Sequence, residues 1–193
     1  AFSSFRLKPV VEALVSLPII LPPSVLGFYL LLAFSPERSF GNFLEEYFDV
    51  RLVFTFTGLV VSSVFYSLPF MVQPFQSGFK MIPQALVDAS YTLGRSKFET
   101  LIHVLLPNMR VALITGTILA FAHTIGEFGV VLMIGGSIPE ETRVVSIALY
   151  DEVQAMNYHT ANIYAAILLA FSFLILVTVY SINQRFSANL FRP

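Results

Sequence analysis

The chain contains no cysteine and no tryptophan, and only 12% of its 193 residues are charged. Without cysteine there are no disulfides, no thiolate nucleophile and no cysteine ligands for a metal. The formal net charge of −1 gives no basic surface that could neutralise the phosphates of a nucleic acid, so no nucleic-acid partner is expected. A soluble domain carries roughly 25% charged residues. With 56% hydrophobic residues and a mean hydropathy of +0.77, the sequence predicts an integral membrane protein, a single domain over residues 1–193.

The sequence also lacks the common signatures of enzymes. Its three histidines, His103, His123 and His159, are scattered and form no His-Glu-x-x-His zinc pattern. There is no Gly-x-Ser-x-Gly nucleophile elbow and no Gly-x4-Gly-Lys-Ser/Thr phosphate loop. We therefore expect no catalytic residues, no metal site and no cofactor of its own. If the chain works with ATP, another polypeptide must bind the nucleotide.

Four largely uncharged runs are long enough to cross a bilayer, which takes about 20 apolar residues. We predict helical spans at about 13–34, 52–75, 111–134 and 160–183. Pro18, Pro22 and Pro23 lie inside the first run, so its helix must kink or unwind, and the freed carbonyls need protein or water partners. Two interpretations remain open here: a kinked structural helix, or a broken segment that lines a pathway.

The connections between the spans are polar. Residues 37–51 form an acidic loop, and the connection from Gly135 to His159 begins as a loop and then predicts a short interfacial helix at Ser146–Gln154. Eight Lys and Arg residues lie before the first span, between the second and third, and after the fourth, against three in the other two connections. Because cytoplasmic segments carry the excess of basic residues, this distribution places both termini and the central connection in the cytoplasm.

The central connection, residues 83–107, has the pattern of two short helices joined by a bend. Pro83 suits the first turn of a helix, where its missing N–H would have no partner in any case. Gly94 supplies a left-handed stop. Ser96 and Glu99 have the spacing of a capping box, in which each side chain accepts a hydrogen bond from the other residue's backbone N–H. A second helix is therefore expected to start just after Ser96.

The first of these helices has a small apolar face. Leu86, Ala89, Ser90 and Leu93 fall on one side of it, and Asp88 points elsewhere. Such a face suits docking into the groove of a partner protein. An ordinary amphipathic helix in a loop fits the same spacing, so the pattern alone leaves both interpretations open.

The same segment resembles the signature loop of ABC importer permeases, which reads Glu-Ala-Ala, three residues, Gly, nine residues, Ile, one residue, Leu-Pro. The matching positions of this chain are Asp88, Ala89, Ser90, Gly94, Val104, Leu106 and Pro107. Asp, Ser and Val are conservative departures from Glu, Ala and Ile, and the spacing is intact. The resemblance implies that these seven residues couple the chain to an ATPase subunit.

Two further stretches are similar to the molybdate permeases, Leu17–Leu32 and Gly126–Ala155. Sulfate permeases are similar around Gly126–Gly129, so sulfate remains an alternative to molybdate and tungstate. The resemblance implies an all-α type I ABC importer permease, a polytopic helix bundle of the inner membrane with a cytoplasmic coupling helix. It also implies a homodimer, one ATPase subunit under each copy, and an extracytoplasmic binding protein that delivers the oxyanion. Members of the family have five or six spans, so we expect N-terminal sequence to be missing here.

Pro22, Pro23, His123 and Glu127 are the candidate residues for a pathway or for structural roles within the spans. Glu127 is the one acid in a predicted span and should face the bundle or a water-filled cavity. His123, four residues earlier, would share its helical face and could pair with it. The pair could be structural, or a proton relay as in an ion-coupled secondary transporter. No Lys or Arg lies within a span, so backbone and hydroxyl donors would have to contact an oxyanion.

Overall fold

The computed structural model describes residues 6–190, and every regular element in that range is a helix, as predicted. In chain order the elements are α1 (Lys8–Ile20), α2 (Pro23–Phe34), α3 (Ser39–Phe48), α4 (Phe56–Met81), α5 (Gln84–Thr92), α6 (Lys97–Thr100), the π-helix η1 (Leu101–Leu105), α7 (Leu106–Asn108), α8 (Arg110–Gly126), α9 (Gly129–Gly135), α10 (Val145–Gln154) and α11 (Tyr158–Leu190).

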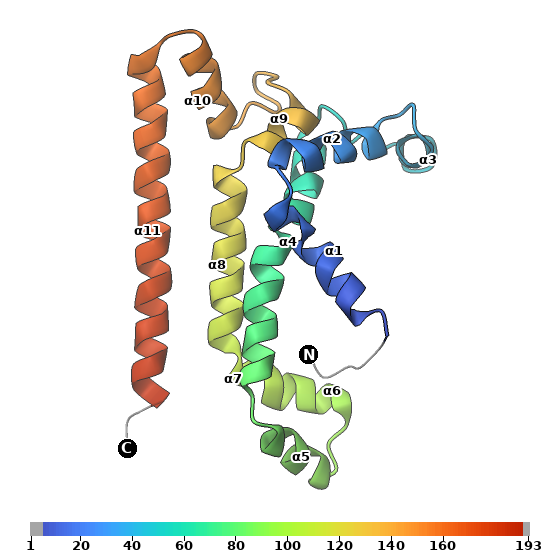
Figure 1. Ribbon diagram of the computed structural model, residues 1–193, viewed down its shortest axis with the longest axis vertical. Coiled ribbons are helices and arrows are strands. Elements are labelled where there is room, and N and C mark those ends of the chain that lie inside the picture. The colour runs from blue at the N-terminus through green and yellow to red at the C-terminus, as the bar shows by residue number, and fades with distance from the viewer. Residues whose placement is uncertain (1–5, 191–193) are drawn as a thin grey trace.

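The bundle is built on three long helices, α4, α8 and α11, whose axes are roughly parallel, with α8 running opposite to the other two (Figure 1). α4 packs along α8, and α11 contacts α8 and α10. The segment from α5 to α7 lies at one end, here named the α5 end, and α2, α3, α9 and α10 lie at the opposite end (Figure 1). Among the described residues, two helices can cross a membrane alone, and four spans result if two bent pairs each count as one.

The first predicted span is broken rather than continuous. α1 and α2 meet at an angle of 115°, and the chain between them is extended, with ψ angles of 138° at Leu21 and 133° at Pro22. A residue that precedes proline is pushed toward this extended conformation, and Leu21 and Pro22 both precede one. Pro23 then begins α2 at the position where a helix tolerates proline best. Pro18, by contrast, lies inside α1 without ending it.

The third predicted span, residues 111–134, is also divided, which corrects the sequence-based prediction. α8 ends at Gly126, Glu127 is extended with φ −73° and ψ 138°, and α9 starts afresh at Gly129. α9 lies in the largest buried apolar cluster, and its neighbours there come from α2, α4 and α10. The members of this cluster are Phe34, Leu52, Val53, Leu59, Tyr66, Val130, Val131, Ile134 and Ile147.

The outer connections contain more helix than the sequence pattern predicted. Residues 37–51, expected as a loop, contain α3, which ends where Asp49 adopts a left-handed conformation at φ 52°. The Val50 N–H then donates to the Leu44 carbonyl, a bond that closes the end of the helix. The expected helix at Ser146–Gln154 is confirmed as α10, one residue longer at its start.

Close packing of α2 on α9 depends on Gly27. A Cβ at this position would lie 2.8 Å from the Met133 Cβ and 3.0 Å from the Val130 Cα. Distances this short require the two helices to move apart. The glycine is therefore a packing requirement of the contact that holds the two broken spans together.

Substituting alanine for Gly27 should destabilise the chain, and Gly126→Ala is the matched control, because both residues are helical and a Cβ at Gly126 has no atom within 4 Å. Alanine is favoured over glycine in a helix by about 1 kcal/mol at either site. Overpacking should lower the free energy of unfolding of Gly27→Ala by about 1–3 kcal/mol relative to the control. Thermal unfolding of both variants in detergent measures the difference, and equal midpoints would contradict the packing argument.

Candidate coupling and pathway sites

The short helix α5 stands exposed at the α5 end of the molecule, as the sequence predicted (Figure 1). It begins after Pro83 and ends at Thr92, close to the expected bounds. Asp88, the first residue of the signature loop, is exposed, and its Oδ1 accepts a hydrogen bond of 3.0 Å from Gln84 Nε2. The carboxylate therefore stays on the surface, held by a neighbour one turn earlier.

Gly94 turns the chain from α5 toward α6. Its φ is +78°, and its N–H donates to the Tyr91 carbonyl at 2.9 Å, so the left-handed stop expected from the sequence is confirmed. A Cβ at Gly94 would have no atom within 4 Å. Glycine is therefore needed for the backbone conformation and not for space.

The capping box at the start of α6 is confirmed. Ser96 Oγ accepts from the Glu99 N–H at 3.3 Å, and Glu99 Oε2 accepts from the Ser96 N–H at 2.8 Å. The hydrogen bond from the Ser96 backbone holds the pKa of the Glu99 carboxyl below its ordinary value, and the Ser96 side chain adds to the effect. The two bonds together fix the direction in which α6 leaves the bend.

α6 continues through a π-helical turn before it meets the membrane-spanning α8. Leu106 N–H donates to the Leu101 carbonyl, five residues back, and Pro107 follows directly. Wide turns of this kind accommodate a proline whose N–H is missing. Asn108 Nδ2 donates to the Val104 carbonyl at 2.6 Å, and the chain then bends by 73° into α8. Pro107 thus lies just before the bend, as the sequence indicated.

A second buried apolar cluster joins this segment to the long helices α4 and α8. Its buried members are Ile82, Val87, Leu105 and Met109, which come from the end of α4, from α5, from η1 and from the junction before α8. Leu106 packs against it from the side. The cluster therefore packs α5 against the ends of both α4 and α8.

The structure corrects the predicted docking face of α5 at one residue. Ser90 is only 4% exposed, and its hydroxyl shares a hydrogen bond of 2.9 Å with Thr100 of α6. It therefore packs inside the segment and is not available to a partner. Leu86, Ala89 and Leu93 remain exposed and form the apolar face, with Leu93 81% exposed.

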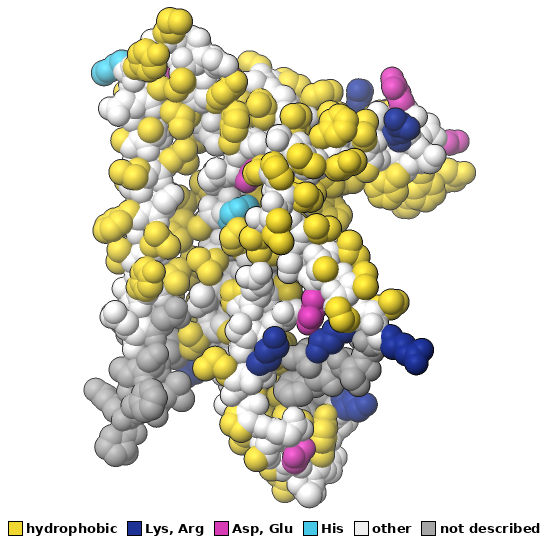
Figure 2. Space-filling model, viewed as in Figure 1, with side chains coloured by type: hydrophobic (Ala, Val, Ile, Leu, Met, Phe, Trp, Pro, Cys, Tyr) yellow, Lys and Arg dark blue, Asp and Glu magenta, His cyan; other side chains and the backbone are white. Residues whose placement is uncertain are grey.

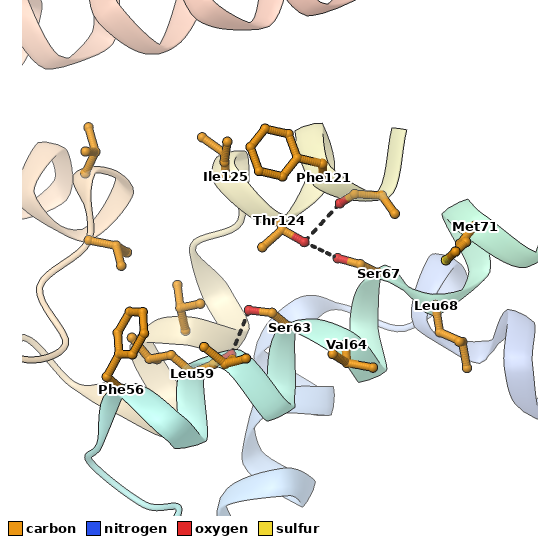
Figure 3. A pocket seen from close by; sticks show the side chains of 15 residues that line it. Phe56, Leu59, Ser63, Val64, Ser67, Leu68, Met71, Phe121, Thr124 and Ile125 are labelled. Carbon is orange, nitrogen blue, oxygen red and sulfur yellow. Dashed lines mark hydrogen bonds between the residues drawn. The ribbon is translucent and has the colours of Figure 1, made fainter. Parts of the chain in front are cut away.

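A groove of about 550 Å³ runs along α4 and α8, and it is the candidate for a pathway or for a packing surface (Figure 3). Most of its lining is apolar, and none of the 15 residues that line it is charged. Three hydroxyl groups interrupt the apolar lining, those of Ser63, Ser67 and Thr124.

The hydroxyl hydrogens of the groove are all used within the protein. Ser63 donates to the Leu59 carbonyl at 2.7 Å, and Thr124 donates to the Ala120 carbonyl at 2.9 Å. Since Thr124 has only one hydrogen, Ser67 must be the donor in its 2.7 Å bond to Thr124. The groove therefore presents oxygen lone pairs, and these three residues offer no free donor to an oxyanion.

Glu127 and His123 do not form the expected pair. Because α8 ends at Gly126, the spacing of four residues no longer places them on one helical face. Glu127 Oε1 instead accepts from the Val130 N–H at 3.0 Å and caps the start of α9. The Ser146 hydroxyl donates to the Glu127 carbonyl at 2.6 Å, which satisfies the backbone at the break.

The His123 ring is held by aromatic contacts. It stacks on Phe70 with centroids 3.8 Å apart and lies 5.3 Å from the ring of Tyr66. Its buried Nδ1 has no hydrogen-bond partner among the described residues. The ring is thus placed by packing between α4 and α8 and not by the carboxylate of Glu127.

The two breaks in the predicted spans meet. Pro22 and Pro23 are exposed at the break between α1 and α2, and a Cβ at Gly129 would lie only 2.8 Å from the Pro23 Cβ. The start of α2 therefore lies against the start of α9, which Glu127 caps. Of the pathway candidates, the structure brings Pro23 and the Glu127 turn together and leaves His123 with the aromatic rings of α4.

Sequence reasoning missed Thr100, the groove hydroxyls and α3. No sequence pattern marks Thr100 as important, because its buried hydrogen bond with Ser90 depends on how α5 and α6 pack across the bend. The spacing of Phe40, Phe43, Leu44 and Tyr47 at helical intervals could have revealed α3.

The capping box should respond to pH. Because the folded-state pKa of Glu99 is lowered, its stabilising effect is present above the ordinary value of 4.5 and is lost as pH falls through the lower, folded-state value. Hydrogen exchange at the first turn of α6 should therefore accelerate in acid more than its intrinsic rate predicts. Glu99→Gln keeps a capping oxygen that does not titrate and should remove this excess. An identical profile for both chains would contradict the assignment.

Glu127 should act as a helix cap and not as a proton carrier. Glu127→Gln keeps an oxygen for the Val130 N–H and should leave stability and transport nearly unchanged. Glu127→Ala removes the acceptor and should lower the free energy of unfolding by about 1 kcal/mol. Thermal unfolding and a transport assay on both variants distinguish the roles. Loss of transport in Glu127→Gln at unchanged stability would instead support a proton relay.

Comparison with known proteins gives the family of this chain. Residues 1–192 match the family described as binding-protein-dependent transport system inner membrane component. The chain is 49% identical over 185 residues to the molybdenum transport system permease protein ModB of Azotobacter vinelandii, a match that covers 96% of this chain and 81% of that protein.

Two further relatives carry related names. The sulfate transport system permease protein CysT of Salmonella typhimurium is 34% identical, over 95% of this chain and 66% of its own length. The putative molybdenum transport system permease protein YvgM of Bacillus subtilis is 33% identical, over 90% of this chain and 77% of its own length. The chain thus belongs to the family of inner membrane components of binding-protein-dependent transport systems.

Proposed function

We propose that this permease moves molybdate into the cell and that a separate subunit hydrolyses the ATP that drives it. The observation that carries the proposal is the exposed helix α5, which presents the signature spacing and is joined by one apolar cluster to the ends of α4 and α8. The chain itself would bind no nucleotide and no cofactor. Its own role is to form the membrane passage.

The exposed face of α5 is the proposed contact with the ATPase. Leu86, Ala89 and Leu93 give an apolar surface for the partner's groove, and Asp88 adds a charge beside it. Behind this face, Val87 belongs to the cluster that reaches Met109 at the start of α8. Movement of the ATPase would therefore tilt α4 and α8. Gly94, Val104, Leu106 and Pro107 would set the shape of this connection.

Two copies of the chain would form the functional pore. Only 6% of the most apolar stretch of 18 residues in α11 is buried, and the groove along α4 and α8 is open and apolar. A second copy together with lipid would cover these surfaces. Each copy would carry one ATPase subunit at its α5 end, and an extracytoplasmic binding protein would deliver the oxyanion at the opposite end.

The proposed orientation places the α5 end in the cytoplasm of a multi-pass inner-membrane protein, with both ends of the chain on that side. Figure 2 shows Lys and Arg side chains gathered in the lower part of the molecule, around the α5 end. Cytoplasmic segments carry such an excess. The start of α1 and the last turns of α11 lie toward the same end (Figure 1).

The choice of molybdate rests on the names of the relatives. Proteins named for molybdenum transport match at 49% and 33% identity, and those named for sulfate at up to 34%. Sulfate is therefore the second candidate substrate, and tungstate fits the same chemistry as molybdate. An ion-coupled secondary transporter is the weaker alternative, because its only candidate groups, His123 and Glu127, are not paired with each other.

The test is a series of substitutions at Gly94 in the permease, purified with its ATPase and reconstituted with its binding protein. Proline cannot adopt a φ of +78°, and it lacks the N–H that donates a hydrogen bond to the Tyr91 carbonyl. Alanine adopts this conformation at a cost of about 1–2 kcal/mol, and asparagine more easily. ATPase binding and ATP-dependent molybdate uptake should fall in the order Gly, Asn, Ala, Pro. The native mass of the wild-type complex should correspond to two copies of each subunit.

Gly126→Ala is the matched control, because a Cβ at Gly126 also has open space but φ there is not positive. This variant should bind and transport as the wild type does. Full ATPase binding and uptake by Gly94→Pro would overturn the coupling role. Sulfate uptake without molybdate uptake would select the alternative substrate, and uptake driven by an ion gradient without ATPase would select the secondary transporter.

A further inference from the structure

The helix α3 carries an aromatic face that no other part of the described chain covers. Phe40, Phe43, Tyr47 and Phe48 share one side of the helix, and all four are at least 45% exposed, with Tyr47 at 70%. Neighbouring rings contact one another on this side, since Phe43 lies 5.0 Å from Tyr47 and 5.7 Å from Phe48. The face is a continuous apolar surface and not a set of scattered residues.

The opposite side of α3 is polar. Asn42, Glu45 and Glu46 lie there, and Arg38 and Asp49 flank the helix at its two ends. A helix of 10 residues with this division of side chains is too short to span a bilayer. It has the pattern of a helix that lies in the membrane interface, with its apolar face toward the acyl chains.

The position of α3 fits that placement. In Figure 1, α3 is seen end-on, whereas α4, α8 and α11 lie nearly in the plane of the picture. The axis of α3 is therefore roughly perpendicular to those of the spanning helices. Figure 2 shows apolar atoms on the side of this region that faces the α5 end, and charged atoms on its upper and outer sides. The apolar side of this region therefore faces the α5 end, along the stretch that the long helices span, and the charged side chains face away from it.

The helix is held firmly in this position. A Cβ at Gly41 would overlap the Ser35 carbonyl oxygen, so the backbone of α3 packs directly on the end of α2. The Phe40 ring lies 6.1 Å from the buried ring of Phe34, and Leu44 packs against the main apolar cluster. The exposure of the aromatic face is thus a built feature of the fold.

We propose that α3 lies in the outer interface of the membrane and binds lipid through Phe40, Phe43, Tyr47 and Phe48. Aromatic rings with one polar end, such as tyrosine, favour this zone. The helix α2, which contacts α3, also exposes two aromatic side chains, Phe28 and Tyr29. This anchor would hold the connection between α2 and α4 at a fixed depth.

These 193 residues contain no cysteine, so a cysteine introduced at one position is the only labelling site among them. Nitroxide labels are placed at Phe43 and Tyr47 on the aromatic face, and at Asn42 and Glu46 on the polar face as matched controls on the same helix. Leu169 of α11 serves as the lipid reference. The permease and ATPase complex is reconstituted into vesicles of phosphatidylethanolamine and phosphatidylglycerol. Power saturation then compares collisions with oxygen and with a water-soluble nickel chelate.

Labels at Phe43 and Tyr47 should collide more often with oxygen than with the nickel chelate, as the label at Leu169 does. Labels at Asn42 and Glu46 should collide more often with the nickel chelate. Equal nickel access on both faces would show that α3 stands in water and would overturn the proposal. Exclusion of both reagents from the aromatic face would show that a protein covers it, which also overturns the proposal. Binding of the ATPase in the purified complex confirms that each labelled chain is folded.

Discussion

Every break in a membrane helix needs partners for the backbone groups that it frees, and this requirement shapes the structure. At the end of α8 the Glu127 carboxylate and the Ser146 hydroxyl satisfy the backbone. Before α8, the chain widens into a π turn ahead of Pro107, and the Asn108 side-chain amide donates to the Val104 carbonyl beside it. The break between α1 and α2 is packed against the start of α9. Irregular backbone is thus concentrated where the chain itself supplies hydrogen bonds and close contacts.

The same requirement separates the rigid and the exposed parts of the chain. α9 and its neighbours fill the main buried cluster at one end, and the smaller cluster around Met109 ties α5 to α4 and α8 at the other. Between them, the sides of α4, α8 and α11 stay open and apolar. The ends of the subunit are thus fixed by its own packing, and its open middle is the surface that the proposed second copy and lipid would cover.

The sequence predicted the features that depend on local chemistry. Gly94, the capping box of Ser96 and Glu99, and the bounds of α5 follow from single residues and short spacings. It could not predict features set by packing between distant segments. Helical periodicity predicts Ser90 on the docking face, because it does not reveal that Thr100 lies behind it. Hydropathy predicts one span around Glu127, because it does not distinguish a continuous helix from two apolar helices joined by a capped break.

If the proposed second copy leaves the groove open as part of the passage, the groove hydroxyls would affect the time that an oxyanion spends in the membrane. With the hydrogens of Ser63, Ser67 and Thr124 all engaged, this surface offers an anion only lone pairs and hydrocarbon. An oxyanion passing along it would keep its water and find no well in which to settle. Its residence would then be brief, and the rate of each cycle would be governed by the motion of the helices rather than by escape of the cargo.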